Sequence, residues 1–362
     1  MVTRHVNFNA GPSTLPLPVL ERAQREFLDY EGSGMSIIEH SHRGAVYEAV
    51  HNDAIERLTR VLQIPDTHQV LFMHGGASTQ FALIPMNLRN DAGSGDYIVT
   101  GTWGQKALGE AKIVATPHVA WDQSVEGRYE RLPKQDELNL RPDAPYVHLT
   151  SNNTIMGTQF FELPDTGAVP LVVDMSSDIL WRPIDVSRFA MIYAGAQKNM
   201  GPSGVTVLIM RKDLIEGARK DIPKIFRYGE VAKANSLQNT IATFPVYMVR
   251  NVLAWIEEQG GLPAMERHNR AKGEAIYGAI DGSDGFYRCP VATEDRSVMN
   301  VVFRLPSEAL DKKFVAEATA AGLVGLKGHR QVGGIRASIY NAMPLDGVER
   351  LVDFMHRFAQ AN

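Results

Sequence analysis

Residues 191–204 read MIYAGAQKNMGPSG, and this stretch decides the fold. The apolar runs 191–194 and 205–210 predict two buried strands, and Lys198 lies in the turn of small residues between them. Small neighbours allow a flat ligand to approach the backbone closely. A lysine in an enclosed site can lose its proton, and the neutral amine can form a Schiff base with a carbonyl compound. A lysine in a turn is more often a solvated surface residue, so the functional interpretation depends on the residues around it.

Other short apolar runs alternate with helical patterns along the first 260 residues. The predicted strands are residues 70–73, 97–100, 113–115, 146–149, 171–173, 191–194 and 205–210. This alternation predicts an α/β fold in which helices cover both faces of a mostly parallel sheet. Ligands in such folds bind beyond the carboxyl ends of the strands. The candidate residues that directly follow a strand are Gly76, Trp103, Thr154, Asp174 and Lys198.

The pattern changes near Gly260 and Gly261, where a long helix ends and a shorter alternation of helices and strands begins. We therefore expect an N-terminal arm over residues 1–15, a large domain over residues 16–258 and a smaller α+β domain over residues 259–362.

Composition limits the possible functions. The chain has 362 residues, 44% hydrophobic and 22% charged, with a formal net charge of -4, which argues against nucleic-acid binding driven by bulk charge. The single cysteine, Cys289, excludes a disulfide framework and a cysteine-based zinc site, and we expect no metal. The sequence contains no apolar signal-peptide core and no membrane-spanning run, which predicts a cytoplasmic location.

Two stretches indicate phosphate and cofactor binding. The predicted strand 70–73 runs into HGGASTQ at 74–80 and then into a helix, which is the layout of a phosphate-binding turn, although many such turns carry glycine for geometry alone. Asp174 ends a buried strand, where a carboxylate needs a partner. A protonated ring nitrogen would be such a partner, and a helix cap or salt bridge is the structural alternative. The sequence contains neither GxxxxGK[ST] nor GxGxxG, so nucleotide binding loses support.

Two loops are rich in cations. Residues 40–44 read HSHRG, and residues 325–336 read GLKGHRQVGGIR. Arginine side chains in flexible loops suit carboxylate and phosphate groups, whereas a lone arginine is more often simply solvated.

Taken together, these motifs resemble the fold-type I, pyridoxal-phosphate-dependent aminotransferases of class V, and within that class the phosphoserine aminotransferases. The resemblance covers the whole chain. It rests on NFNAGPSTLP at 7–16, SHRG at 41–44, GTWG at 101–104, GAQKN at 195–199 and GLKGHR at 325–330. One position departs from some members, which carry an arginine after the two glycines where this chain has Ala77.

The resemblance implies roles for individual residues. Lys198 would bind pyridoxal 5'-phosphate covalently, and Asp174 would keep the pyridine nitrogen protonated; these two are the expected catalytic residues. The other residues expected to bind the cofactor are Ala77, Ser78, Trp103, Thr154, Gln197, Asn239 and Thr240, the last two from a neighbouring subunit. The expected substrate-binding residues are His42, Arg43, His329, Arg330 and Arg336, of which Arg336 would hold the α-carboxylate.

The resemblance further implies a homodimer with shared active sites. The implied reaction is a reversible transamination between glutamate and 3-phosphohydroxypyruvate, giving O-phosphoserine and 2-oxoglutarate in serine biosynthesis. In bacterial members it extends to 4-phosphohydroxythreonine in pyridoxine synthesis. The alternatives are a serine– or alanine–glyoxylate aminotransferase and a non-catalytic protein that binds the same cofactor on the same fold. A cysteine desulfurase fits less well, because Cys289 lies far from the glycine-rich loops.

Overall fold

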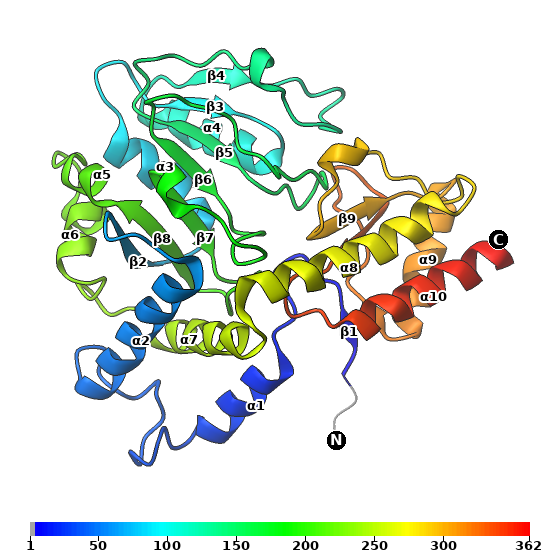
Figure 1. The fold of residues 1–362 in the computed structure, drawn as a ribbon, viewed down its shortest axis with the longest axis horizontal. Helices are drawn as coiled ribbons and strands as arrows, with labels where there is room; N and C mark the ends of the chain where they lie inside the picture. The colour runs from blue at the N-terminus through cyan, green and yellow to red at the C-terminus, as the bar shows by residue number, and fades with distance from the viewer. Residues whose placement is uncertain (1–3) are drawn as a thin grey trace.

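The computed structural model describes residues 4–362 (Figure 1). A seven-stranded sheet with the order β2-β8-β7-β6-β5-β3-β4 forms its larger part. The strands are β2 (His68–His74), β3 (Asp96–Ile98), β4 (His118–Trp121), β5 (Val147–Thr150), β6 (Leu171–Asp174), β7 (Met191–Gly195) and β8 (Val205–Arg211). Neighbouring strands from β7 to β4 are parallel, whereas β8 is antiparallel to both β7 and β2. The predicted mostly parallel sheet is therefore confirmed.

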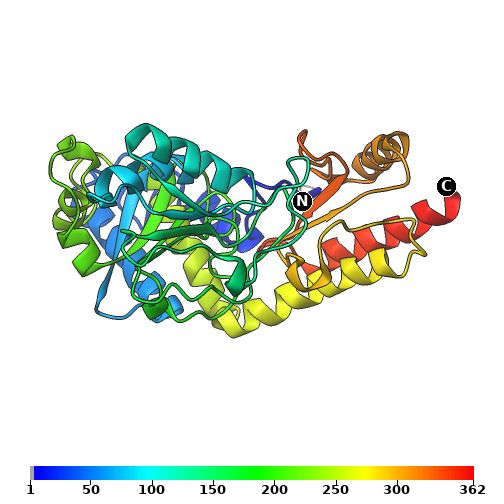
Figure 2. The same cartoon turned by 90° about the horizontal axis from the view of Figure 1, so that it is seen from above.

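Helices cover both faces of this sheet. They are α1 (Leu17–Glu26), α2 (Ala45–Leu62), α3 (Ala77–Leu88), α4 (Thr102–Val114), α5 (Lys212–Glu216), α6 (Tyr228–Lys233) and α7 (Thr243–Glu258). Helix α2 packs against α7, and α3 packs against α4. Figure 2 shows α4 (cyan) on the opposite side of the sheet from α2 (blue). Because β5 and β6 are buried along their whole length, their side chains form the centre of the main hydrophobic core.

One predicted strand is wrong. Residues 113–115 do not form a strand, because helix α4 continues to Val114 and the strand begins later, at His118. The helix buries Ala107, Leu108 and Ala111 on one face, whereas Ile113 is 80% exposed on another. A short apolar run therefore could not distinguish the exposed end of a helix from a buried strand.

The C-terminal part is a smaller α+β unit. Its elements are α8 (Gly261–Asp281), β9 (Asn300–Phe303), α9 (Glu308–Ala320), β10 (Leu323–Val324), β11 (Ile335–Ser338) and α10 (Leu345–Ala361), and β1 (Val6–Asn7) of the N-terminal arm pairs in parallel with β10. Strands β9 and β11 are antiparallel, and α8 packs against α10. Short 3-10 turns lie at Gln135–Glu137, Val186–Arg188, Lys224–Phe226 and Thr293–Asp295.

Residues 4–362 contain two large hydrophobic clusters and a small third one of Trp181, Met299 and Tyr340, and α8 contributes to both large ones. Leu262 and Met265 of α8 belong to the cluster under the large sheet, whereas Ile276 belongs to the C-terminal cluster. Phe8 of the arm is fully buried in the C-terminal cluster, so the arm joins the first residues of the chain to its last third. The limits of the arm and of the two domains stay a prediction.

Residues 4–362 contain neither a candidate membrane-spanning helix nor a candidate metal site. No helix there has the length and apolar character needed to cross a membrane. The same residues contain no cluster of three histidine, cysteine or acidic side chains arranged to hold a metal ion.

Candidate active site

A cavity of about 280 Å³ opens where the central strands end. Its walls come from the turns after β2, β5, β6 and β7, from the first turn of α4, from the N-terminal arm and from the C-terminal unit. Residues that line it are Ala10, Gly11, Gly76, Ala77, Ser78, Phe81, Trp103, Thr154, Ile155, Asp174, Ser176, Gln197, Lys198, His329 and Arg336. Nine of the residues predicted from the sequence are therefore brought together: Ala77, Ser78, Trp103, Thr154, Asp174, Gln197, Lys198, His329 and Arg336.

Lys198 lies in the turn after β7. Its backbone is fixed by the N-terminal arm, because Ser13 Oγ donates to Lys198 O at 2.5 Å and Ser13 N donates to Gln197 O at 3.0 Å. Burial lowers the pKa of Lys198 to about 8, although the neighbouring carboxylates of Asp174 and Asp178 act in the opposite direction. At pH 7 roughly a tenth of the Lys198 side chains are therefore neutral, nucleophilic amines, far more than for an ordinary lysine.

Asp174 is the last residue of β6 and is only 4% exposed. It accepts hydrogen bonds from Ser176 Oγ at 2.6 Å and from Ser176 N at 2.9 Å. Burial raises the pKa of Asp174, while the Lys198 ammonium and the two Ser176 donors act to lower it. A cationic ring nitrogen placed in the cavity would stabilise this carboxylate in its charged form.

Asp178 is a second buried carboxyl group, which the sequence reasoning missed. It accepts from Ser151 Oγ at 2.5 Å, and burial raises the pKa of Asp178 to about 7. Nothing in the short segment around Asp178 distinguishes it from a surface aspartate, so only the fold reveals its position below Lys198 and Asp174.

The glycine-rich turn after β2 leads into helix α3 at the wall of the cavity. Gly75 has a left-handed conformation at φ +89°, and Gly76 precedes the first residue of α3 without any side-chain cap. The first backbone N–H groups of the helix, at Ala77 and Ser78, therefore remain available to an anion. Within residues 4–362, the buried Gln197 Oε1 has no hydrogen-bond partner. Because that oxygen only accepts hydrogen bonds, the group Gln197 can offer to an anion is its amide nitrogen Nε2, which lies 3.9 Å from the position of a Cβ placed on Gly76.

Trp103 and Thr154 form a pair on the cavity wall. The indole Nε1 of Trp103 donates to Thr154 Oγ1 at 2.9 Å, and the Lys198 Nζ lies 5.5 Å from the Trp103 ring centroid. Because Thr154 Oγ1 already accepts this bond, its own hydroxyl hydrogen is free to be donated to a ligand.

Arg336 brings a cation to the cavity, and His329 brings an imidazole beside it. Arg336 Nη1 donates to Thr154 O at 3.2 Å, and the buried Nε of Arg336 has no partner among the described residues. Burial lowers the pKa of His329, as do the nearby cations Arg336, Arg330 and Lys106. Lys106 was not predicted; it lies on α4, with its Nζ 4.7 Å from the Trp103 ring centroid.

The other predicted residues do not line this cavity. Arg330 is exposed next to His329, and Asn239 and Thr240 are exposed before α7. Arg43 lies beside that second segment, since its Nη2 is 3.3 Å from Gln238 O and 3.4 Å from Leu237 O. His42, Arg43, Asn239 and Thr240 therefore form a separate polar region of this chain.

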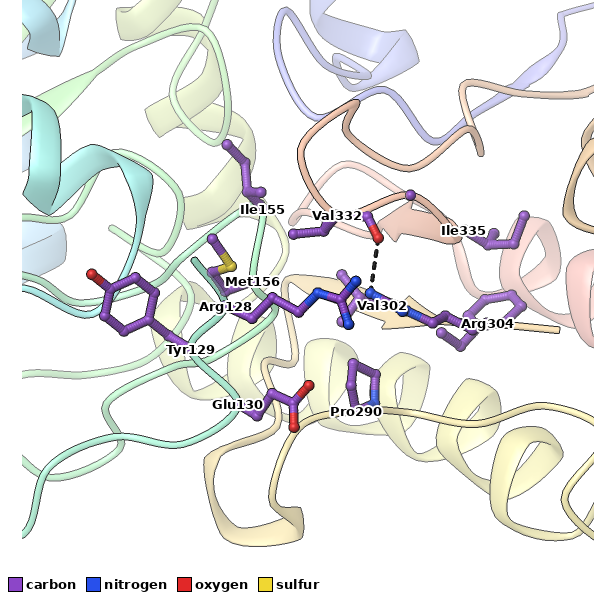
Figure 3. Close-up of a pocket in the computed structure, with 12 residues that line it drawn as sticks. Arg128, Tyr129, Glu130, Ile155, Met156, Pro290, Val302, Arg304, Val332 and Ile335 are labelled. Atoms are coloured by element: carbon purple, nitrogen blue, oxygen red, sulfur yellow. Dashed lines mark hydrogen bonds between the residues drawn. The ribbon is translucent and has the colours of Figure 1, made fainter. Parts of the chain in front are cut away.

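A smaller cavity of about 30 Å³ lies beside the active-site wall (Figure 3). It is lined by Arg128, Met156 and Pro290 among others, and Arg304 Nη2 donates to Val332 O at 2.8 Å across it. On the same measure, this volume is about a tenth of the 280 Å³ of the larger cavity, which is therefore the better candidate for a substrate site.

The fold and the larger cavity define an α/β protein in which a buried lysine amine and a buried carboxylate line one cavity. Comparisons with known proteins agree. Residues 5–351 match the model of the family "Aminotransferase class-V", and the chain belongs to this family.

Similar proteins carry a more specific name. The chain is 56% identical over 361 residues to a phosphoserine aminotransferase from Niallia circulans, with 100% of this chain and 99% of that protein covered. A solved phosphoserine aminotransferase from Bacillus circulans subsp. alkalophilus superposes with a TM-score of 0.97 at 56% identity, covering 99% of both chains. A PLP-bound phosphoserine aminotransferase from Trichomonas vaginalis gives a TM-score of 0.94 at 39% identity, covering 98% of this chain and 100% of that one.

Proposed function

We propose that this chain is a pyridoxal-phosphate-dependent transaminase that converts glutamate and 3-phosphohydroxypyruvate into 2-oxoglutarate and O-phosphoserine, the precursor of serine. The observation that carries the proposal is that one cavity gathers three kinds of groups. These are the N-terminus of α3, the pair Lys198 and Asp174, and the side chains of Arg336 and His329. The full-length similarity to phosphoserine aminotransferases supports the choice of substrates.

The residues present fit the proposed cofactor. The open N–H groups at the start of α3 and the Gln197 Nε2 donor beside Gly76 suit a phosphate, and the buried Asp174 suits a protonated ring nitrogen. Trp103 offers an aromatic face, and Thr154 offers a free hydroxyl hydrogen. When bound, pyridoxal phosphate supplies an electron sink that withdraws the electron pair from the Cα–H bond of an amino acid.

Lys198 then carries the proton. With a pKa of about 8, the Nζ of Lys198 would act as an effective base near neutral pH for the Cα proton of an amino acid bound in the cavity. Arg336 orients the substrate by binding its α-carboxylate through two parallel N–H donors, one of which is the free Nε. Proton transfer at Lys198 and orientation by Arg336 are therefore the chain's own contributions to the reaction.

The distal end of the substrate needs further cations, because it carries a carboxylate in glutamate and a phosphate in O-phosphoserine. We propose that His329 and Arg330 meet His42 and Arg43 of a partner subunit there, and that the partner's Asn239 and Thr240 reach the cofactor phosphate. In this chain His42, Arg43, Asn239 and Thr240 lie together but away from the cavity, as residues that serve a neighbouring site would.

Exposed apolar side chains next to these residues support a homodimer. Leu28 is 82% exposed, Ile38 49% and Ile225 47%, and Ile225 O accepts a hydrogen bond from Gln238 Nε2 at 3.3 Å. Large apolar side chains that gather beside functional residues mark an interaction surface. Sedimentation velocity should therefore give a dimer, and Ile38→Asp should dissociate it. A cytoplasmic location and activity on 4-phosphohydroxythreonine stay predictions.

The test is a half-reaction followed by absorbance. Purified protein loaded with pyridoxal phosphate should lose its visible absorption band when O-phosphoserine or glutamate is added, but hardly when serine or alanine is added. Equal loss with serine or alanine would move the function to a glyoxylate-type aminotransferase, and no band after adding the cofactor would contradict the role of Lys198. Lys198→Ala should abolish turnover, and Arg330→Ala should weaken the apparent affinity for O-phosphoserine.

A further inference from the structure

Tyr340 connects the C-terminal unit to the N-terminal arm directly above the active-site lysine. Its side chain is 2% exposed, and its hydroxyl donates to Ala10 O at 2.6 Å while accepting from Asn300 Nδ2 at 3.1 Å. Ala10 and Gly11 line the active-site cavity. A Cβ placed on Gly11 would lie 3.2 Å from Cγ of Lys198, so the arm touches the lysine side chain.

The same hydroxyl ends a buried hydrogen-bond network that begins in the large domain. Asn152 Nδ2 donates to Ser177 Oγ at 2.7 Å and to Asn300 Oδ1 at 2.8 Å. Asn300 Nδ2 donates in turn to Ser338 Oγ at 2.9 Å and to the Tyr340 hydroxyl. Both hydrogens of each amide are used, so the network has one defined arrangement.

The arm is held on both sides of Ala10 by backbone contacts. Phe8 N donates to Val324 O at 2.8 Å on one side, and Ser13 Oγ donates to Lys198 O at 2.5 Å on the other. Tyr340 holds the carbonyl between these two anchors. Because burial raises the pKa of Tyr340 above its ordinary value, the hydroxyl stays a donor throughout the physiological pH range.

Arg336 lies four residues before Tyr340 on the segment that contains β11, and Ser338 lies halfway between them. Alternate side chains of a strand point to the same face, so Arg336 lies on the same face of β11 as Ser338, which accepts a hydrogen bond from Asn300 of the network. A change in the network would therefore alter the positions of both the arm beside Lys198 and the guanidinium of Arg336.

We propose that Tyr340 is a positioning residue, whose hydroxyl holds residues 10–11 as a wall of the amino-acid site and keeps that wall aligned with Arg336. This proposal rests on the proposed function, because it assigns the wall to binding of the amino-acid substrate. The expected consequence of losing the hydroxyl is weaker substrate binding rather than loss of the cofactor, because its two partners, Ala10 O and Asn300 Nδ2, belong neither to the turn after β2 nor to β6, which carry the groups proposed to bind the cofactor phosphate and ring nitrogen.

The test compares Tyr340→Phe with Tyr287→Phe in the cofactor-loaded protein. Tyr287 is a matched control, because it is also 2% exposed and its hydroxyl also donates to a backbone carbonyl, Met355 O at 2.8 Å, but far from the cavity. Two quantities are measured: hydrogen exchange of the peptide covering residues 8–13, and the steady-state parameters with glutamate.

Loss of one hydrogen bond predicts that Y340F raises the KM for glutamate about fivefold, with kcat within about twofold of the parent. Exchange of residues 8–13 should become about fivefold faster in Y340F and stay unchanged in Y287F, with the same cofactor content in both. The proposal is overturned if Y340F behaves like Y287F in both measurements. It is also overturned if arm exchange rises while the KM does not.

A second variant keeps the proposal testable should Y340F fail to fold. Ser13→Ala removes the neighbouring arm anchor, so it should also speed exchange of residues 8–13 and raise the KM for glutamate. Faster exchange in S13A without any change in KM would contradict the arm's role as a wall. Hydrogen exchange does not depend on turnover, so a parent protein inactive with glutamate would refute the proposed function while the link between Tyr340 and the arm is still measured.

Discussion

The lowered pKa of Lys198 can be measured by chemical modification of the cofactor-free protein. With a pKa of about 8, roughly 9% of the Lys198 side chain is neutral at pH 7, compared with about 0.04% for an ordinary lysine of pKa about 10.4. The difference is about 200-fold in the concentration of reactive amine at the same pH. Burial inside the cavity is the main cause of the lowered pKa of Lys198. The carboxylates of Asp174 and Asp178 offset only part of this effect.

The assay is reductive methylation with formaldehyde and cyanoborohydride, followed by mass spectrometry of the peptide that contains Lys198. We take the ratio of its modification rate to that of surface lysines in the same digest, so that effects of pH on the reagents cancel. The ratio should be constant below about pH 7 and fall about tenfold per pH unit above about pH 8.5, where Lys198 is already neutral and the surface lysines are not.

A matched variant separates the causes of the shift. Since the Asp174 carboxylate raises the pKa of Lys198, Asp174→Asn should move the break in this ratio to lower pH. A ratio that stays constant up to pH 10 in the parent protein would refute the reasoning about burial. A break that moves to higher pH in Asp174→Asn would refute the assigned electrostatic role of Asp174.

Three further predictions concern side chains outside the catalytic pair. Arg141→Ala should lower the free energy of unfolding in urea by about 3 kcal/mol, because the fully buried Asp96 carboxylate loses its guanidinium partner at 2.7 Å and keeps only the backbone N–H of residue 141 at 2.6 Å. Adding Asp96→Asn to this variant should restore part of the lost stability, and a loss below about 1 kcal/mol in Arg141→Ala would contradict the argument. Trp103→Phe keeps an aromatic face but removes the hydrogen-bond donor to Thr154. The Kd for pyridoxal phosphate, measured by fluorescence titration, should therefore rise about fivefold. An unchanged Kd would show that this hydrogen bond does not contribute to cofactor binding. Burial lowers the pKa of His51 to about 4, so below about pH 6.5 the folded state binds fewer protons than the unfolded state. The free energy of unfolding should therefore fall by about 2 kcal/mol between pH 7 and pH 5. His51→Gln should make the stability, measured by urea unfolding, depend less on pH in this range, and an equally steep dependence would assign the loss to other groups.

Much of the fold followed from local patterns. The turn between 191–194 and 205–210 was correctly placed between two strands, and the glycines at 75–76 were correctly placed between a strand and a helix. Both predictions succeeded because short buried strands bounded by glycine differ clearly from helical periodicity. The strand predicted at 113–115 failed because three apolar residues fit a helix end equally well.

The chemistry of the candidate site was predictable for a related reason. Residues that follow parallel strands meet at one edge of the sheet, so Lys198, Asp174 and Thr154 could be expected to lie together from their places in the chain alone. Asp178 and Lys106 carry no such signal. Lys106 became a candidate because helix α4 places it near His329. Asp178 became a candidate because the loop after β6 places it near Lys198.

The sequence by itself determined the succession of strands and helices, the lysine and the carboxylate of the site, and the family resemblance, because each depends on short segments. Only the tertiary structure decided which of these segments share a cavity, how far burial lowers the pKa of Lys198, and that Tyr340 reaches Ala10, 330 residues away along the chain. The physical reason is that burial and hydrogen bonding depend on distances between segments that are remote in sequence, and those distances are set by the packing of the whole molecule.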